Sequence, residues 1–164
     1  MIQKKICMLG SFAVGKTSLI RRFVESIYSE AYHTTVGVKV DKKVVRHNNC
    51  DIVLVLWDLY GEDEFQKMRW SYLRGAAGYL LVADGTRRNT LEKAFQLQQR
   101  VREELGEIPF IFVINKADLV QDWELDPAME SQLAARNWTI SRSSAKTGEN
   151  VEEAFSQLTR KMLA

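Results

Sequence analysis

The chain has 164 residues, of which 46% are hydrophobic and 27% charged, and its net charge is +2. These values fit one globular domain, 1–164, and the small net charge, without a basic block, gives no reason to expect a nucleic-acid partner. The sequence has no run of about twenty apolar residues, so no membrane span is expected.

The two cysteines indicate the compartment. Cys7 lies in an apolar run and Cys50 in a polar turn, which favours free thiols in a reducing cytoplasm over a disulfide framework. The C-terminal stretch LTRKMLA contains no cysteine, so no prenyl anchor is expected in this chain. The sequence does not indicate an oligomeric state, and a cytoplasmic monomer is assumed.

Short apolar runs alternate with longer amphipathic segments along the chain. The predicted strands cover residues 2–9, 37–45, 51–58, 78–86, 109–118 and 138–144, with the second and third paired around the turn HNNC. The predicted helices cover residues 16–26 and 89–105, a short segment after Pro127, and 150–163 with Asn150 as the cap. This alternation predicts an α/β fold in which helices cover both faces of a mainly parallel sheet. Ligands of such folds bind beyond the carboxyl ends of the strands.

The segment GSFAVGKT, residues 10–17, matches the phosphate-binding pattern G-x-x-x-x-G-K-[ST]. A strand is predicted before it and a helix after it, which is the context that the pattern requires. In such a loop backbone amides cradle phosphate, the lysine reaches the β and γ phosphates, and the hydroxyl ligates magnesium. The expected ligands are Ala13, Val14, Gly15, Lys16, Thr17 and Ser18, with Thr17 also binding the metal. A chance match of glycines and a lysine is the competing interpretation.

The segment FVINKADL carries polar residues beyond the end of an apolar strand. Asp118 can accept hydrogen bonds from N1 and the exocyclic amino group of guanine, two donors that adenine lacks. Asn115 and Lys116 are expected to brace the loop and the base. Ala145 and Lys146, in SSAKTG, are expected to form a second wall around it. Each residue is an ordinary loop residue, but together and in this order they predict guanine as the base.

With these motifs on both sides of the nucleotide, the chain resembles the Ras-superfamily small GTPases over essentially its whole length. The stretch YLRGAAGYLLVAD is close to the Rab branch. The resemblance implies a P-loop G domain with a six-stranded, mostly parallel sheet and helices on both faces, which binds GTP or GDP with Mg²⁺. The residues that match the family's guanine motifs are Asn115, Lys116, Asp118, Ser144, Ala145 and Lys146.

Segment 28–40 resembles the first switch of this family. Thr35 matches the threonine that binds magnesium and the γ-phosphate only when triphosphate is present. Tyr28 matches an aromatic residue packed on the edge of the base, and Tyr32 resembles a tyrosine that covers the phosphates. Val40 stands where a Rab surface triad has phenylalanine, so the resemblance does not extend to a standard set of Rab partners.

Segment 58–72 resembles the second switch. Asp58 matches the carboxylate that reaches magnesium through water, and Gly61 matches the amide that contacts the γ-phosphate. Trp57 and Tyr72 match the other two aromatic residues of the Rab triad. The resemblance implies that loss of the γ-phosphate releases both segments, which effector and regulatory proteins then read as a change of surface.

Two substitutions bear on GTP hydrolysis, for which the expected residues are Lys16, Thr35, Gly61 and Glu62. Glu62 occupies the position of the family's catalytic glutamine, and an ionised carboxylate only accepts hydrogen bonds and adds negative charge beside an anionic transition state. Phe12 occupies a position where the family has a small residue, so its ring is expected to crowd the catalytic space. Two effects oppose this interpretation: glutamate is the stronger base toward water, and Phe12 could simply pack on the switches.

The leading hypothesis is therefore a guanine-nucleotide switch with slow GTPase activity. A hydrolysis-deficient, GTP-bound scaffold is the alternative that Phe12 and Glu62 favour. A third hypothesis is the G domain of a larger multidomain GTPase, in which a neighbour supplies the missing catalytic group. An ATP-using P-loop kinase is the weakest, because Asp118 argues against adenine.

Overall fold

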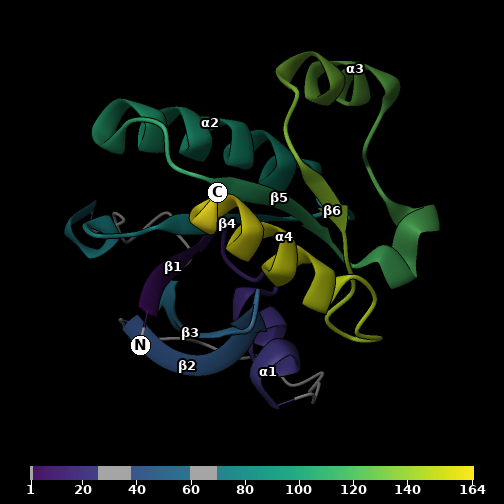
Figure 1. Cartoon of the computed structure of the whole chain (residues 1–164). Coiled ribbons are helices and arrows are strands. Elements are labelled where there is room, and N and C mark those ends of the chain that lie inside the picture. Colours follow the sequence, from purple (N-terminus) through teal and green to yellow (C-terminus); the bar gives the residue numbers. More distant parts are fainter. Residues whose placement is uncertain (1, 26–37, 60–69) are drawn as a thin grey trace.

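A mostly parallel sheet forms the centre of the protein in a computed structural model, which describes residues 2–25, 38–59 and 70–164 (Figure 1). Its six strands within these ranges are β1 Ile2–Gly10, β2 Val38–His47, β3 Cys50–Leu59, β4 Gly78–Asp84, β5 Phe110–Asn115 and β6 Ile140–Arg142. Their order across the sheet is β2-β3-β1-β4-β5-β6. The β2–β3 pair is antiparallel and every other pair is parallel, which confirms the predicted sheet.

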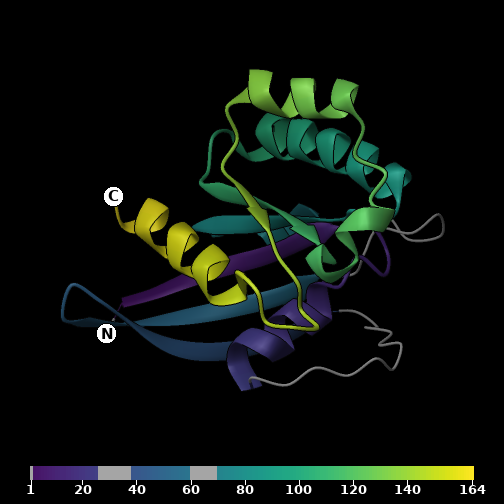
Figure 2. The same ribbon diagram turned by 90° about the vertical axis from the view of Figure 1, so that its right-hand side faces the viewer.

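Helices cover both faces of this sheet, as predicted. They are α1 Lys16–Glu25, α2 Arg88–Leu105, α3 Pro127–Arg136 and α4 Val151–Leu163, with short 3₁₀ segments η1 Trp70–Leu73 and η2 Ala117–Asp122. Figure 2 shows α2 and α3 on one side of the sheet and α1 and α4 on the other. Over the ranges that the structure describes, no helix combines the length and the apolar character needed to cross a bilayer.

The two faces follow from the alternation of side chains along β1. Ile6 and Met8 join the core beneath α1 and α4, whereas Cys7 and Leu9 join the core beneath α2 and α3. Successive side chains of a strand point to opposite faces, so an uninterrupted apolar run is what a strand buried on both sides requires. The loop that follows β1 therefore starts from a rigid, fully buried position.

Local sequence also explains the hairpin between β2 and β3. Asn48 and Asn49 have φ values of 50° and 65° and connect the paired residues His47 and Cys50. A two-residue turn with positive φ at both positions matches the twist of the flanking strands, and asparagine tolerates this conformation better than most residues.

The two later helices begin in different ways. The α3 helix has Pro127 in its first turn, and the Asp126 side chain caps it by accepting a hydrogen bond from the Met129 amide at 2.9 Å. Asn150 stands at the cap position of α4, as predicted, but its side chain makes no capping hydrogen bond. Its Nδ2 donates instead to the Arg142 carbonyl at 2.8 Å, which ties the start of α4 to β6.

The burial of Cys7 has a consequence for its chemistry. Both cysteines are free; Cys7 is buried and Cys50 is exposed. Burial raises the pKa of the Cys7 thiol to about 12, against a smaller opposing effect of Lys5. Because the thiolate is the nucleophile, Cys7 stays protonated and unreactive in neutral solution.

We therefore expect iodoacetamide at pH 8 to alkylate Cys50 and to leave Cys7 unmodified in the folded protein. Peptide mass spectrometry after quenching measures both sites, and both should react in denaturant. Alkylation of Cys7 at the rate of Cys50 under native conditions would contradict the buried position of β1.

Candidate functional site

The segment 10–17 forms a tight loop between β1 and α1, at the carboxyl edge of the parallel strands. Gly10 and Gly15 leave no room for a side chain: a Cβ at Gly10 would lie 2.3 Å from the Val82 carbonyl oxygen, and one at Gly15 would lie 2.2 Å from Asn115 Nδ2. Gly15 also has a φ of 103°, which residues with a Cβ rarely adopt. Both glycines of the pattern are therefore required by close packing against β4 and β5.

Lys16 begins α1 and turns its side chain back over the loop. Its ammonium donates to the Gly10 carbonyl at 3.0 Å and to the Ser11 carbonyl at 3.4 Å, and only 6% of the residue is exposed. Burial lowers the pKa of Lys16 to about 8, and the charge of Asp58 partly opposes this shift. A buried ammonium in this position gains strongly from an anionic ligand, because added negative charge favours its protonated form.

Thr17 and Asp58 meet across the same edge of the sheet. The Thr17 hydroxyl donates to Asp58 Oδ2, and Asp58, near the end of β3, is 1% exposed. Hydroxyl and carboxylate oxygens are the ligand types that Mg²⁺ prefers, so this pair fits the predicted metal site in its chemistry. The two residues are 41 positions apart in the sequence, and the β1–β3 pairing brings them together.

Asn115 joins the phosphate loop to the loops expected to hold the base. Its Nδ2 donates to the Val14 carbonyl at 2.9 Å, and its Oδ1 accepts from the Ala145 amide at 3.2 Å. Asn115 is buried at the end of β5. One side chain thus fixes the relative position of three segments, which is a more specific role than the bracing predicted from the sequence.

The orientation of Asp118 is set by Ser144. The Ser144 hydroxyl donates to Asp118 Oδ1 at 2.7 Å and accepts from the Thr147 amide at 3.1 Å. In addition, Arg22 of α1 donates to the carbonyls of Ala145 and Lys146. The Asp118 carboxylate and the loop 144–147 are therefore held together by contacts within the protein itself.

Lys116 has a left-handed backbone with φ of 73°. Its carbonyl accepts from Trp123 Nε1 at 2.8 Å, and its ammonium pairs with Asp84 Oδ2 at 2.8 Å. The Trp123 ring packs so closely on Gly85 that a Cβ there would lie 2.3 Å from it. The sequence pattern does not indicate this role for Trp123, and its hydrogen bond to the backbone of Lys116 is a finding of the structure.

Part of the predicted switch surface is described as well. Trp57 and Tyr72 lie with ring centroids 6.3 Å apart, and Val40 is the register partner of Trp57 on the edge strand β2. Val40 is 45% exposed. The three positions of the Rab-like triad thus adjoin one another or pair in the sheet, although Val40 presents a smaller side chain than phenylalanine would.

The described site residues from the sequence fall into two neighbouring groups, the loop 10–18 with Asp58 and the loops 115–118 and 144–146. Tyr28, Tyr32, Thr35, Gly61 and Glu62 lie outside the described residues, and their roles stay predictions. Asp84, Arg87 and Trp123 also contribute to the site, and no nucleotide-binding motif in the sequence includes them. Asp84 could have been identified as a candidate site residue, because it is a carboxylate at the end of the apolar run GYLLVAD. Nothing in the sequence pattern indicates a role for Arg87.

The fold and these loops define a nucleotide-binding α/β protein of the P-loop type, and comparison with known proteins agrees. The model of the Ras family matches residues 5–164. The chain is 36% identical to Ras-related protein Rab-4A of Danio rerio over 97% of this chain and 76% of that protein. It is 35% identical to the GTP-binding protein Rheb homolog of Dictyostelium discoideum over 94% of this chain and 85% of that protein. Ras-related protein Rab-1 of Theileria annulata is 34% identical over 95% of this chain and 72% of that protein.

The chain therefore belongs to the Ras family and is a small GTPase near the Rab branch. Family membership supports a small GTP-binding switch protein with GTP hydrolysis as its activity.

Proposed function

We propose that the chain, as a single G domain over residues 1–164, binds GTP and GDP with Mg²⁺ and hydrolyses GTP slowly. In this proposal effector and regulatory proteins in the cytoplasm read segments 28–40 and 58–72. The observation that carries it is the position of Asn115, whose amide joins the phosphate loop to both loops expected to hold guanine. A phosphate loop alone is found in many P-loop proteins. The connection of this loop through Asn115 to the loops 115–118 and 144–146 supports a guanine nucleotide whose phosphates bind to the first and whose base binds to the others.

The phosphate side of the proposed site rests on the backbone amides of residues 13–18 and on Lys16. The buried lysine, held 3.0 Å from the Gly10 carbonyl, is placed to contact an anion beside the loop. Thr17 and Thr35 would hold Mg²⁺, with Asp58 nearby, and bound Mg²⁺ neutralises part of the charge of the phosphates. Lys16 and the amide of Gly61 would stabilise charge on the γ-phosphate oxygens.

The base side rests on Asp118, with Asn115 and Lys116 before it. The Ser144 hydroxyl donates to Asp118 Oδ1 at 2.7 Å and so restrains the carboxylate, which supports its proposed role as the acceptor of the two guanine donors. Ala145 and Lys146 would line the base, and Arg22 holds the carbonyls of both residues. Tyr28 and Tyr32 would cover the base edge and the phosphates, as the resemblance to the family implies.

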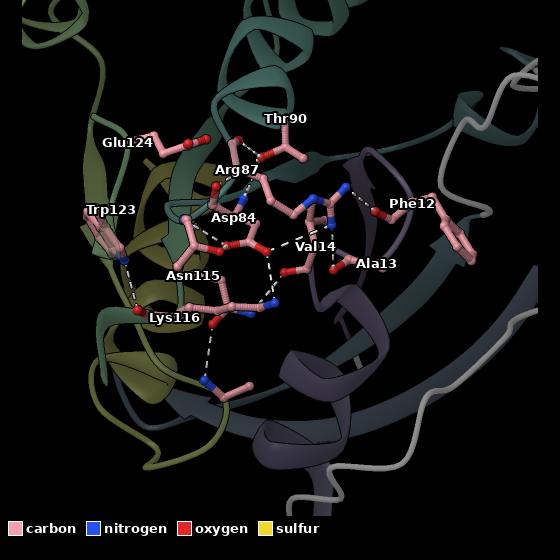
Figure 3. A network of polar contacts seen from close by, with 12 residues as sticks. Phe12, Ala13, Val14, Asp84, Arg87, Thr90, Asn115, Lys116, Trp123 and Glu124 are labelled. Atoms are coloured by element: carbon pink, nitrogen blue, oxygen red, sulfur yellow. Dashed lines mark hydrogen bonds and ion pairs between the residues drawn. The ribbon is translucent and has the colours of Figure 1, made fainter. Parts of the chain in front are cut away.

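Slow hydrolysis rests on Glu62 and Phe12. Glu62 would accept hydrogen bonds from water without donating to the phosphate, and its charge would oppose the anionic transition state. Phe12 is half-buried in the phosphate loop, and its ring points away from Arg87 in Figure 3. A second candidate function, a GTP-bound scaffold without turnover, follows from the same two residues if their effect is large. A neighbouring domain that supplies a catalytic group would make the chain part of a larger GTPase.

Single-turnover hydrolysis tests this proposal. Protein stripped of nucleotide and reloaded with GTP and Mg²⁺ would be followed by chromatography of the bound nucleotide. We expect Glu62→Gln and Phe12→Gly each to speed hydrolysis on the order of 10- to 100-fold. The first variant restores a hydrogen-bond donor near the γ-phosphate, and the second restores space there. Glu104→Gln, an exposed substitution on α2, is the matched charge control and should leave the rate unchanged.

The outcomes separate the candidate functions. Measurable wild-type turnover that rises in both variants supports the slow switch, and GTP that persists for many hours supports the scaffold. A wild type as fast as both variants would contradict the roles assigned to Glu62 and Phe12.

A further inference from the structure

Arg87 reaches from the start of α2 to the outer side of the phosphate loop. Its guanidinium donates to the Phe12 carbonyl at 3.0 Å and to the Ala13 carbonyl at 3.2 Å. Figure 3 shows the guanidinium between these two carbonyls and the carboxylate of Asp84. We propose that Arg87 is a positioning residue that holds the phosphate loop in its nucleotide-binding shape and so slows release of GDP. This inference rests on the proposed function.

The phosphate loop needs such a restraint at this point. Ala13 has a φ of 59°, in the left-handed region that residues with a Cβ seldom occupy, so its conformation costs free energy. An arginine that donates to the carbonyls of Phe12 and Ala13 fixes the peptide planes on both sides of the Ala13 Cα. Because each peptide plane carries an amide on its other edge, fixing the carbonyls also fixes the direction of the following amides.

Asp84 orients Arg87 and links it to the base side of the site. The fully buried Asp84 places its Oδ2 3.8 Å from Arg87 Nη1 and 2.8 Å from Lys116 Nζ. Its Oδ1 accepts from the Thr86 amide at 2.9 Å and from the Thr86 hydroxyl at 2.7 Å. One carboxylate therefore orients two cations, one directed at the phosphate loop and the other beside the guanine loop.

The backbone around Arg87 is equally well fixed. Its amide donates to the Asp84 carbonyl at 3.0 Å, and its carbonyl accepts from the buried Thr90 hydroxyl at 2.8 Å. Thr90 Oγ1 also accepts from the Asp84 amide at 2.9 Å. A side chain that starts from a fixed backbone loses less conformational entropy when it makes its contacts, so Arg87 is suited to hold a loop.

The contacts of Arg87 indicate positioning and not catalysis. Phosphate binds to the amides of such a loop, whereas Arg87 binds to carbonyls, so it acts through the loop. The neighbouring Arg88 provides a contrast, because its side chain pairs with Glu92 at 3.0 Å and with Asp126. The two adjacent arginines therefore have the same charge and different partners, which makes Arg88 a matched control.

Release of a fluorescent GDP analogue, carrying a methylanthraniloyl group and chased with excess GDP in Mg²⁺ buffer, tests the proposal. We expect Arg87→Ala to release the analogue about tenfold faster than wild type, the size of effect that a lost pair of charged hydrogen bonds at a partly exposed side chain gives. The release rate of Arg88→Ala should stay within about twofold of the wild-type rate, because this variant loses only surface ion pairs. Arg87→Lys should keep most of the defect, because a lysine cannot contact both carbonyls with a planar fork.

Two further measurements separate positioning from a general structural role. The melting temperature of the nucleotide-free protein should be the same in Arg87→Ala and Arg88→Ala. Competition against the analogue should show that Arg87→Ala lowers the affinity for GDP more than the affinity for GMP, which lacks the β-phosphate. An equal loss for GDP and GMP together with a lower melting temperature, or a wild-type release rate in Arg87→Lys, would overturn the proposal. So would a wild-type release rate in Arg87→Ala, whereas failure of the wild type to bind the analogue would contradict the proposed function itself.

Discussion

Asp118→Asn is expected to lower the affinity for GDP by about 10³ or more and to make xanthosine diphosphate the better ligand. Guanine presents two donors, N1–H and the amino group, to the two oxygens of a carboxylate. Xanthine keeps N1–H but has a carbonyl in place of the amino group, and an asparagine side chain offers one acceptor and one donor. A site built to pair with one set of groups rejects the mismatched ligand by large factors, because polar groups are left unpaired in both partners.

The structure favours this exchange because the side chain is already oriented. Ser144 holds Asp118 Oδ1 at 2.7 Å, and its hydroxyl can serve the amide of an asparagine as well. Equilibrium competition of GDP and xanthosine diphosphate against a fluorescent nucleotide measures the change. Asp122→Asn, on the exposed end of η2, is the control and should leave both affinities unchanged. Tight GDP binding by Asp118→Asn would mean that Asp118 does not read the base.

Much of the architecture could be predicted because buried parallel strands have a plain signature. The second half of β1 and most of β4 and β5 are apolar on both faces, and amphipathic segments follow these runs, so the sheet and the helices were both predictable. The glycines and the lysine of the phosphate loop were equally visible. Their spacing reflects a physical need, since Gly10 and Gly15 have no room for a Cβ.

The contacts by which Arg87 and Trp123 hold the loops of the site were not predictable in the same way. Arg87 binds the backbone carbonyls of Phe12 and Ala13, and any residue supplies a carbonyl, so the sequence at those positions gives no sign of the contact. Trp123 likewise donates to the carbonyl of Lys116. Asn150 was placed correctly, but its side chain bonds to β6, because a tertiary partner replaced the local cap. A contact with a backbone atom depends on which segments the fold brings together. The pattern of side chains along the sequence therefore does not predict it.

Removal of magnesium by a chelator is expected to speed GDP release from the wild type about a hundredfold. This factor corresponds to an attraction of about 2.7 kcal/mol between close charges at a partly solvated site. In Asp58→Asn, release should already be fast in Mg²⁺ buffer, and the chelator should change it by less than about threefold. The reason is that Asn keeps the size of Asp58 and can still accept from the Thr17 hydroxyl, but it lacks the charge that holds a cation.

The comparison isolates the charge of one buried carboxylate. Asp58 is 1% exposed and lies beside Thr17, whereas Asp41 lies on the edge strand β2 and pairs with Lys39 at 3.7 Å. Asp41→Asn therefore removes the same charge from the same sheet and should retain the full response to the chelator. If Asp58→Asn also retained the hundredfold response, the metal would be held without Asp58, and Thr17 would be the side chain that binds it beside the phosphates of GDP. A buried carboxylate is costly unless a cation compensates it, and in that case the ammonium of Lys16, whose charge interacts with Asp58, would be that cation.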